Sequence, residues 1–292
     1  MNRILKQIHA DWAHNRGITG KDVHVAVLDT GAFPHLAIKD RIVYFKDYQS
    51  NKSSPYDDNG HGTHILGIIG GKLPQVGFYG VAPGCKFHVY KILNENGNGK
   101  IKILTDAIWD VIAQCKNHKI QIINISIGVS KELESTDIEM LDHAIDEAWK
   151  RGIIVVAAAG NNGPKNGSVT LPGVNQRVIT VGCLDDRGGG ISSGLKSGFS
   201  GIGPTKSCIV KPEILVPGIN VRSCGNLAPQ HFAIKSGTSM AAPVVTGMIA
   251  LLLQNNPFLT PDEVKMKIYH SVIKLPMQDY CWGYLTVDRL LV

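Results

Sequence analysis

Short, almost wholly apolar runs alternate along the chain with longer stretches in which apolar residues recur at helical spacing. The apolar runs predict strands at 23–28, 86–92, 120–126, 153–159 and 177–183. Several of these runs show no alternation of polar and apolar residues. We therefore expect both of their faces to be covered, as in a parallel sheet flanked by helices.

The stretches between these runs predict helices. Apolar residues at helical spacing, or apolar runs of helical length, occur at 65–71, 104–115, 138–149 and 244–254. Another helix is expected after Thr260, where Pro261 and Glu263 complete the pattern of a capping box. Alternating strands and helices predict an α/β fold with a mostly parallel sheet. Functional groups then belong at the carboxyl ends of its strands.

Composition narrows the class of protein. The 292 residues carry a formal net charge of +6 and 43% are hydrophobic, which suits a single folded domain over residues 1–292. Lys and Arg are dispersed, so we expect no nucleic-acid partner. No apolar run is judged long enough to span a membrane, so we expect no membrane partner. The oligomeric state is unknown from the sequence.

The cysteines and the N-terminal residues bear on the cellular location. Six scattered cysteines without a CxxC pair disfavour a zinc site and a disulfide framework. The first residues, MNRILKQIHADWAHNRG, lack the apolar core and cleavage site of a signal peptide. We expect a cytoplasmic protein with no recognisable prodomain or signal peptide. A secreted mature form is the alternative.

Three glycine-flanked stretches carry candidate chemistry. LDTG ends the first predicted strand with Asp29, DDNGHGTHILG places His61 between two glycines, and SGTSMAAP contains Ser239. Taken singly, Asp29 could cap a turn, and His61 with His64 could bind a metal. We expect no metal, because no further ligand stands at suitable spacing. Ser239 lies in a sequence close to the G-x-S-x-G of α/β-hydrolases, but the order aspartate, histidine, serine disfavours a lipase or esterase.

Taken together, VAVLDTG, NGHGTH, VVAAAGNNG and SGTSMAAP resemble the motifs of the subtilisin-like serine proteases (subtilases, peptidase S8), over roughly residues 10–270. The resemblance implies a three-layer α/β/α fold and hydrolysis of peptide bonds through an acyl-enzyme. Ser239 would be the nucleophile, His61 the base, and Asp29 the group that orients the histidine.

The resemblance also assigns roles around the serine. Asn161 would form the oxyanion hole together with the backbone N–H of Ser239. Ser239 is expected at the start of the predicted apolar helix, where N–H groups are unpaired. In this interpretation Thr238 caps that helix, and Pro243 lies in its first turn, where a missing N–H costs nothing.

Two edges of the fold would pair with an extended peptide, by the same resemblance. The loop 168–173 would complete a pocket for the residue before the cleaved bond. Since no acidic residue occurs there, we expect an apolar or medium-sized residue rather than Arg or Lys at that position. The substrate-binding residues so implied are Gly97, Asn98, Gly99, Ser126, Ile127, Gly128, Ala158 and Gly160.

Two departures from the family pattern concern calcium. In the loop 70–80, Pro74 falls where the family usually has a ligating Asn, and His35 stands where an Asp is usual. Calcium takes oxygen ligands, so we expect the family's strong site to be weak or absent. The sequence therefore predicts no cofactor.

The resulting hypothesis is a serine endopeptidase that acts on peptides or proteins, with limited intracellular processing as its biological role. The alternative from another class is a catalytically silent pseudoprotease that serves as a binding module. A pseudoprotease would normally lack part of the triad. Asp29, His61, Asn161 and Ser239 are all present, which favours the enzyme.

Overall fold

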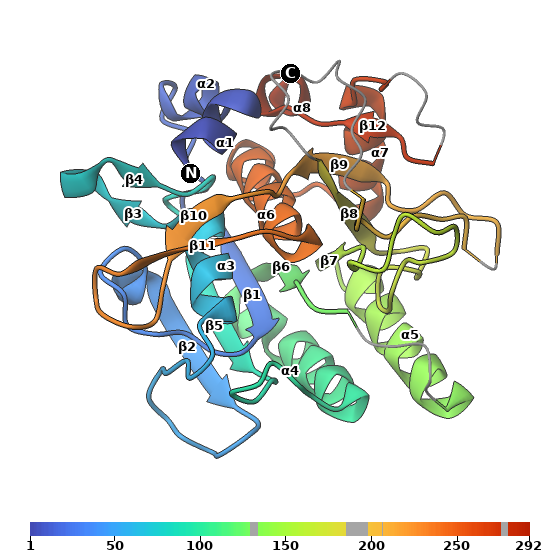
Figure 1. Cartoon of the computed structure of the whole chain (residues 1–292), viewed down its shortest axis with the longest axis horizontal. Helices are drawn as coiled ribbons and strands as arrows, with labels where there is room; N and C mark the ends of the chain where they lie inside the picture. The colour runs from blue at the N-terminus through green and yellow to red at the C-terminus, as the bar shows by residue number, and fades with distance from the viewer. Residues whose placement is uncertain (129–133, 185–197, 206, 276–279) are drawn as a thin grey trace.

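The structure is a computed structural model that describes residues 1–128, 134–184, 198–205, 207–275 and 280–292. Its centre is an eight-stranded sheet in the order β12-β9-β8-β7-β6-β1-β5-β2 (Figure 1). Every neighbouring pair in this sheet is parallel. The strands are β1 (His24–Asp29), β2 (Ile42–Asp47), β5 (Lys86–Lys91), β6 (Ile120–Ile125), β7 (Ile154–Ala158), β8 (Ile179–Leu184), β9 (Ile214–Pro217) and β12 (Gly283–Tyr284).

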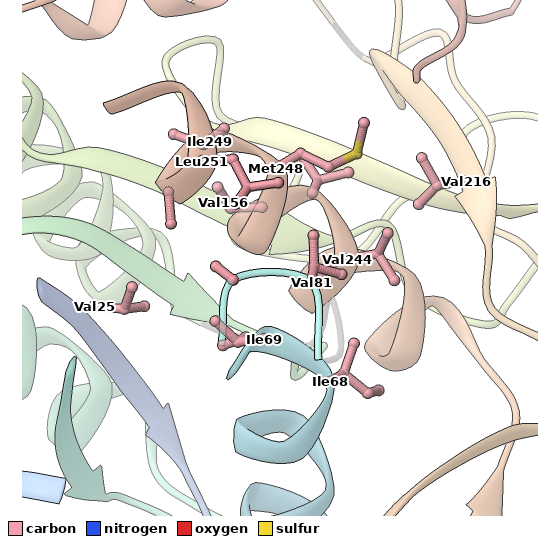
Figure 2. Close-up of a cluster of buried hydrophobic side chains, with 14 of the residues drawn as sticks. Val25, Ile68, Ile69, Val81, Val156, Val216, Val244, Met248, Ile249 and Leu251 are labelled. Carbon is pink, nitrogen blue, oxygen red and sulfur yellow. The ribbon is translucent and has the colours of Figure 1, made fainter. Parts of the chain in front are cut away.

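Helices cover both faces of the sheet, because successive residues of each strand point to opposite sides. In β1, Val25 and Val27 pack with α3 (His61–Gly70) and α6 (Thr238–Asn255). Ala26 and Leu28 pack with α4 (Ile101–His118) and α5 (Ser135–Lys150) on the other face. The predicted three-layer α/β/α fold is confirmed. Figure 2 shows side chains of α3, α6 and the sheet meeting in the first of these cores.

The remaining elements surround this frame. Near the two ends of the chain, α1 (Asn2–Gln7) and α2 (Ala10–His14) lie beside α8 (Val287–Leu291), as Figure 1 shows. The predicted capping box is confirmed in α7 (Pro261–Ser271), where the Thr260 hydroxyl accepts from Glu263 N. The shorter elements are the hairpins β3 (Lys72–Leu73) with β4 (Phe78–Tyr79) and β10 (Val221–Cys224) with β11 (Phe232–Lys235), and the 3-10 turns η1 (Lys39–Arg41) and η2 (Pro74–Val76).

Helix α6 is apolar on all sides and lies in the core. It has 18 residues with a mean hydropathy of 1.2, and 83% of them are buried. By length and composition alone it is one helix that could cross a membrane, so the expectation that no apolar run has this length was wrong. Its burial against α3 and the sheet accounts for the composition, since a helix surrounded by protein has no polar face.

Candidate active site

The first part of the candidate site joins the end of β1 to the start of α3. Asp29, the last residue of β1, is fully buried, and His61 is the first residue of α3. The His61 Nδ1 atom lies 2.8 and 3.0 Å from the two carboxylate oxygens of Asp29. A carboxylate only accepts hydrogen bonds, so Nδ1 carries the proton and Nε2 is left as the basic atom of the ring.

The charge of Asp29 governs the titration of His61. Burial opposes protonation of the imidazole, but the carboxylate at Nδ1 outweighs it through its charge and its hydrogen bond. The pKa of His61 therefore lies above its ordinary value. An imidazole held in this way accepts a proton at Nε2 and is stabilised as the cation that results.

Asp57 fixes the loop that leads into α3. Its two carboxylate oxygens accept from the Thr30 hydroxyl at 2.9 Å, Gly60 N at 2.7 Å, Thr63 N at 2.9 Å and the Thr63 hydroxyl at 2.6 Å. Thr30 in turn accepts from the backbone N–H of Gly62 at 2.8 Å. Asp57 therefore positions His61. The sequence analysis assigned Asp57 no role, although an Asp just before a helix is a common cap.

The alternative that His61 and His64 bind a metal has no support in the part of the chain that the structure describes. No three His, Cys, Asp or Glu side chains are grouped there so that they could hold an ion. His64 instead donates through Nε2 to the carbonyls of Val221 and Ala233, at 3.1 and 3.2 Å. Burial and the neighbouring His61 lower the pKa of His64 to about 3. His64 is therefore neutral, and it fastens the β10–β11 hairpin to α3.

Ser239 is the second residue of α6. Its backbone N–H falls in the first turn, where no earlier helical carbonyl is available to it. Within the described residues, its hydroxyl forms no hydrogen bond. The cap of α6 is Gly237 rather than the predicted Thr238, because the chain enters the helix with φ 146° at position 237, a conformation that favours glycine.

Pro243 also lies elsewhere than predicted. It is the sixth residue of α6, inside the helix rather than in its first turn. An N–H at this position would bond to the carbonyl of Ser239, four residues earlier, and the proline ring cannot supply one. The interpretation was wrong because it counted from the serine instead of from the true start of the helix.

Asn161 reaches across the start of α6. Its Oδ1 atom accepts from both the backbone N–H and the hydroxyl of Thr238, at 3.1 and 3.0 Å. These two donors assign the amide, so its Nδ2 group is left to donate elsewhere. A Cβ atom built on Gly237 would lie 3.4 Å from Nδ2, so glycine also keeps space beside this donor. Thr238 thus orients Asn161, a role the sequence analysis did not assign.

The topology brings the two parts of the site to one edge of the sheet. Asp29 ends β1, Asn161 follows the end of β7, and β6 separates these strands, which puts them about 10 Å apart. Helices α3 and α6 both begin at this edge and pack together. A Cβ on Gly247 would lie 3.3 Å from the Ile69 carbonyl. These residues follow His61 and Ser239 by eight positions each, so the two helices touch at the same number of residues beyond each candidate side chain.

Thr170 lies between the segments that the resemblance assigns to the specificity pocket. A Cβ atom on either Gly128 or Gly160 would collide with its side chain. Ala158 at the end of β7 and Ser126 after β6 are buried, and Ile127 is partly buried. The sequence analysis named the loop 168–173 but not this threonine.

The two implied peptide-binding edges are not strands in this structure. Gly97 adopts φ 76° in a turn between β5 and α4. The Asn94 side chain accepts from the backbone of Asn96 and Asn98, both at 3.0 Å, which explains why this segment turns. Residues 126–128 continue from β6 without regular structure. Pairing of either edge with a peptide stays a prediction.

The residues at the family's calcium position do not fit a calcium ion. The loop forms the β3–β4 hairpin, where Pro74 has no side-chain oxygen. His35 is fully buried, its Nδ1 accepts from Ala37 N at 3.0 Å, and its ring packs edge-on against Phe232. A buried imidazole and a proline offer none of the side-chain oxygens that calcium requires.

Comparison with known proteins agrees with this geometry. The profile of the subtilase family (peptidase S8) matches residues 20–289. The chain is 38% identical over 282 residues to the serine protease AprX of Bacillus subtilis (strain 168), which covers 90% of this chain. It is 32% identical over 272 residues to subtilisin Savinase of Lederbergia lenta, which covers 93% of this chain and 91% of Savinase. The chain belongs to the subtilase family.

The relatives also bear on extent and location. The chain spans 64% of the length of AprX and 40% of the minor extracellular protease Epr of Bacillus subtilis (strain 168). The name of Epr places that relative outside the cell. This fits the secreted alternative for the present chain better than the cytoplasmic one.

Proposed function

We propose that this protein is a serine endopeptidase in which Asp29, His61 and Ser239 form the catalytic triad. The observation that carries the proposal is the Asp29–His61 hydrogen bond at the start of α3, a helix that packs against α6, whose first turn holds Ser239. Its substrates would be peptides or proteins, in keeping with relatives that are named serine protease and subtilisin.

The proposed reaction uses each group for one task. His61 Nε2 removes the proton from the Ser239 hydroxyl as its oxygen attacks the scissile carbonyl. Asp29 keeps the imidazole in the reactive tautomer and stabilises its cation. The oxyanion receives hydrogen bonds from Ser239 N and Asn161 Nδ2, and the N-terminal end of α6 favours the same negative charge. His61 then gives its proton to the leaving amine, and water hydrolyses the acyl-enzyme by the same steps.

Labelling and digestion together test this function. A fluorophosphonate should label the protein covalently at Ser239, and an unbiased peptide mixture should be cut at internal bonds. Labelling without cleavage of peptides would favour an esterase. The absence of both labelling and cleavage would favour the pseudoprotease, an alternative that the family comparison does not support. The rate of casein digestion should also be compared with the rate of cleavage of candidate precursor proteins. If casein is digested fast and at many bonds, the result would argue against a limited processing role.

Thr170 should set the size of the residue accepted before the cleaved bond. Because its side chain lies against Gly128 and Gly160, it takes up room in the proposed pocket. Thr170→Gly is expected to raise kcat/KM for a Phe substrate relative to an Ala substrate by about tenfold or more. Thr170→Val, which keeps the volume, should leave this ratio unchanged. An equal ratio in all three proteins would contradict the assignment.

We propose further that stability does not depend on calcium at the β3–β4 hairpin. A tight site filled at 100 times its Kd would add about 2.7 kcal/mol to the unfolding free energy, or several degrees of Tm. Thermal unfolding of the Ser239→Ala protein, with EDTA and with calcium restored, should therefore give Tm values within about 2 °C. A large fall with EDTA that calcium reverses would overturn the proposal.

A further inference from the structure

Lys235 is a cation without a carboxylate partner beside the proposed catalytic base. It is the last residue of β11, four positions before Ser239, and it is partly exposed. The Lys235 ammonium acts on the titration of His61. Burial and this ammonium lower the pKa of the His61 imidazole, and the charge and hydrogen bond of Asp29 raise it by more. Among the residues that the structure describes, no carboxylate lies within 4 Å of the Lys235 ammonium.

The position of Lys235 follows from the way the hairpin is anchored. Lys235 pairs with Val221 across the hairpin. The carbonyls of Val221 and Ala233 both accept from His64, one turn after His61 on α3. The strand end that carries Lys235 is therefore held against the first turn of α3, and the chain continues from it directly into the serine helix.

The two carboxylates that act on His61, those of Asp29 and Asp57, already accept hydrogen bonds from other groups than Lys235. Asp29 is fully buried beneath the imidazole and bonded to it. Asp57 lies in the loop before α3, with both oxygens occupied by backbone and hydroxyl donors. Neither carboxylate is available to Lys235, so its partly exposed ammonium has no carboxylate beside it among the described residues.

The β10–β11 hairpin and the loop of the proposed acyl side reach the His61 region through different residues. Asn59, just before His61, donates to the Glu95 carbonyl at 2.9 Å, which places the 94–99 loop on that flank of the histidine. The hairpin lies on the flank that carries His64. His61 must hand its proton to the leaving amine, and the proposal below assigns the hairpin flank, which does not carry the 94–99 loop, to the part of the substrate after the cleaved bond.

We propose that Lys235 makes the leaving-group side of the cleft select substrates that carry a carboxylate there. The carboxylate would come either from an acidic side chain in the first two residues after the cleaved bond or from the free C-terminus of a short leaving peptide. The inference rests on the proposed peptidase function and adds a charge preference to it. Partly exposed ion pairs contribute modestly, so the preference is a bias among substrates and not an absolute requirement.

A peptide series with one acyl-side sequence tests the preference. Its leaving sides are Ala-Ala-amide, Asp-Ala-amide, Ala-Asp-amide, Lys-Ala-amide and Ala-Ala with a free carboxylate, and kcat/KM is measured for each by chromatography. The wild type should favour at least one carboxylate-bearing peptide over Lys-Ala-amide by about fivefold. The two amidated Asp peptides report a side chain, and the free acid reports a C-terminus.

Variants then assign the effect to this residue. Lys235→Gln should level the ratio, Lys235→Glu should reverse it, and Lys235→Arg should retain it. Lys116→Gln, an equal charge change at an exposed position of α4, is the matched control and should keep the wild-type ratio. The preference should also shrink at 0.5 M NaCl, since salt screens exposed charges.

The pH profile gives a second readout that a purely structural lysine would not affect. The charged groups acting on His61 are Asp29 and Asp57, which raise its pKa, and Lys235, which lowers it. Lys235→Gln should therefore raise this pKa and move the acidic limb of kcat/KM to higher pH. Equal ratios in wild type, Lys235→Gln and Lys235→Glu would overturn the inference alone. No labelling and no cleavage of any peptide would overturn the proposed function and the inference with it.

Discussion

Ser239→Ala is expected to lower kcat for peptide hydrolysis by about a millionfold. That is the size of the effect known for the nucleophile of subtilisin, where loss of one triad member costs about as much as loss of all three. The physical reason is that no other oxygen stands ready for His61 to activate. The variant keeps the backbone N–H of residue 239 and the Asn161 side-chain amide, so it should still bind substrate. Residual hydrolysis about 10³-fold above the uncatalysed rate is expected from these donors.

The measurement is single-turnover hydrolysis of a peptide substrate, with purified variant and wild type compared at the same pH. Thr246→Ala is a control on the same helix, because Thr246 is buried seven residues after Ser239 and bonds to Asn124. It should retain covalent labelling by a fluorophosphonate, whereas Ser239→Ala should lose labelling. If Ser239→Ala kept more than about one hundredth of the wild-type rate, another residue would have to be the nucleophile.

Most of the interior of the sheet could be predicted from the sequence, but the interior strand β9 and the two edge strands could not. The runs that predicted β1, β5, β6, β7 and β8 are buried on both faces, so their composition is uniform. Strand β2 is at the edge and mostly half-buried, and β12 has only two residues. Neither gives an apolar run. The β10–β11 hairpin was missed because Arg222 and Ile234 are exposed on it.

The site divides in the same way. Asp29 and His61 stand in local motifs, so their residue types and order could be interpreted without the fold. Thr170 and Lys235 lie in contacts between distant segments, and their neighbours in the sequence give no sign of this. Asp57 bonds mainly to Gly60 and Thr63 in its own loop and helix start, so its place before a helix could have indicated its role. The start of α6 was misplaced for a related reason. Its cap depends on the backbone angle of Gly237, whereas the sequence analysis assigned the cap to the hydroxyl of Thr238.

Lys211→Met is expected to lower the unfolding free energy by about 3 kcal/mol or more, and Tm by roughly 5–10 °C. Lys211 and Glu213 are fully buried, with Nζ 2.7 Å from Oε1. The same ammonium donates to the Val178 carbonyl at 2.7 Å and to the Thr180 hydroxyl at 3.0 Å. Glu213 completes the link by accepting from Thr180 N at 2.9 Å. The cluster ties β9 to β8, next to the proposed specificity loop.

The cost arises because the variant leaves a buried carboxylate without its main partner. Burial lowers the pKa of Lys211 to about 8, although Glu213 opposes the shift. Lys211 is therefore charged at pH 7 but poorly solvated. The Lys211–Glu213 pair stabilises the fold only when both residues are present. Lys265 lies 2.8 Å from Glu213 and compensates in part.

Thermal unfolding at pH 7, in a Ser239→Ala background that prevents self-digestion, measures the effect. The control is Lys116→Met at an exposed position of α4, which should change the unfolding free energy by less than about 0.5 kcal/mol. Lys211→Met combined with Glu213→Gln should be less destabilised than Lys211→Met alone, because the second change removes the stranded charge. If the double variant were less stable than the single variant, the destabilisation would come from the loss of hydrogen bonds between the β8 and β9 segments and not from the unpaired carboxylate.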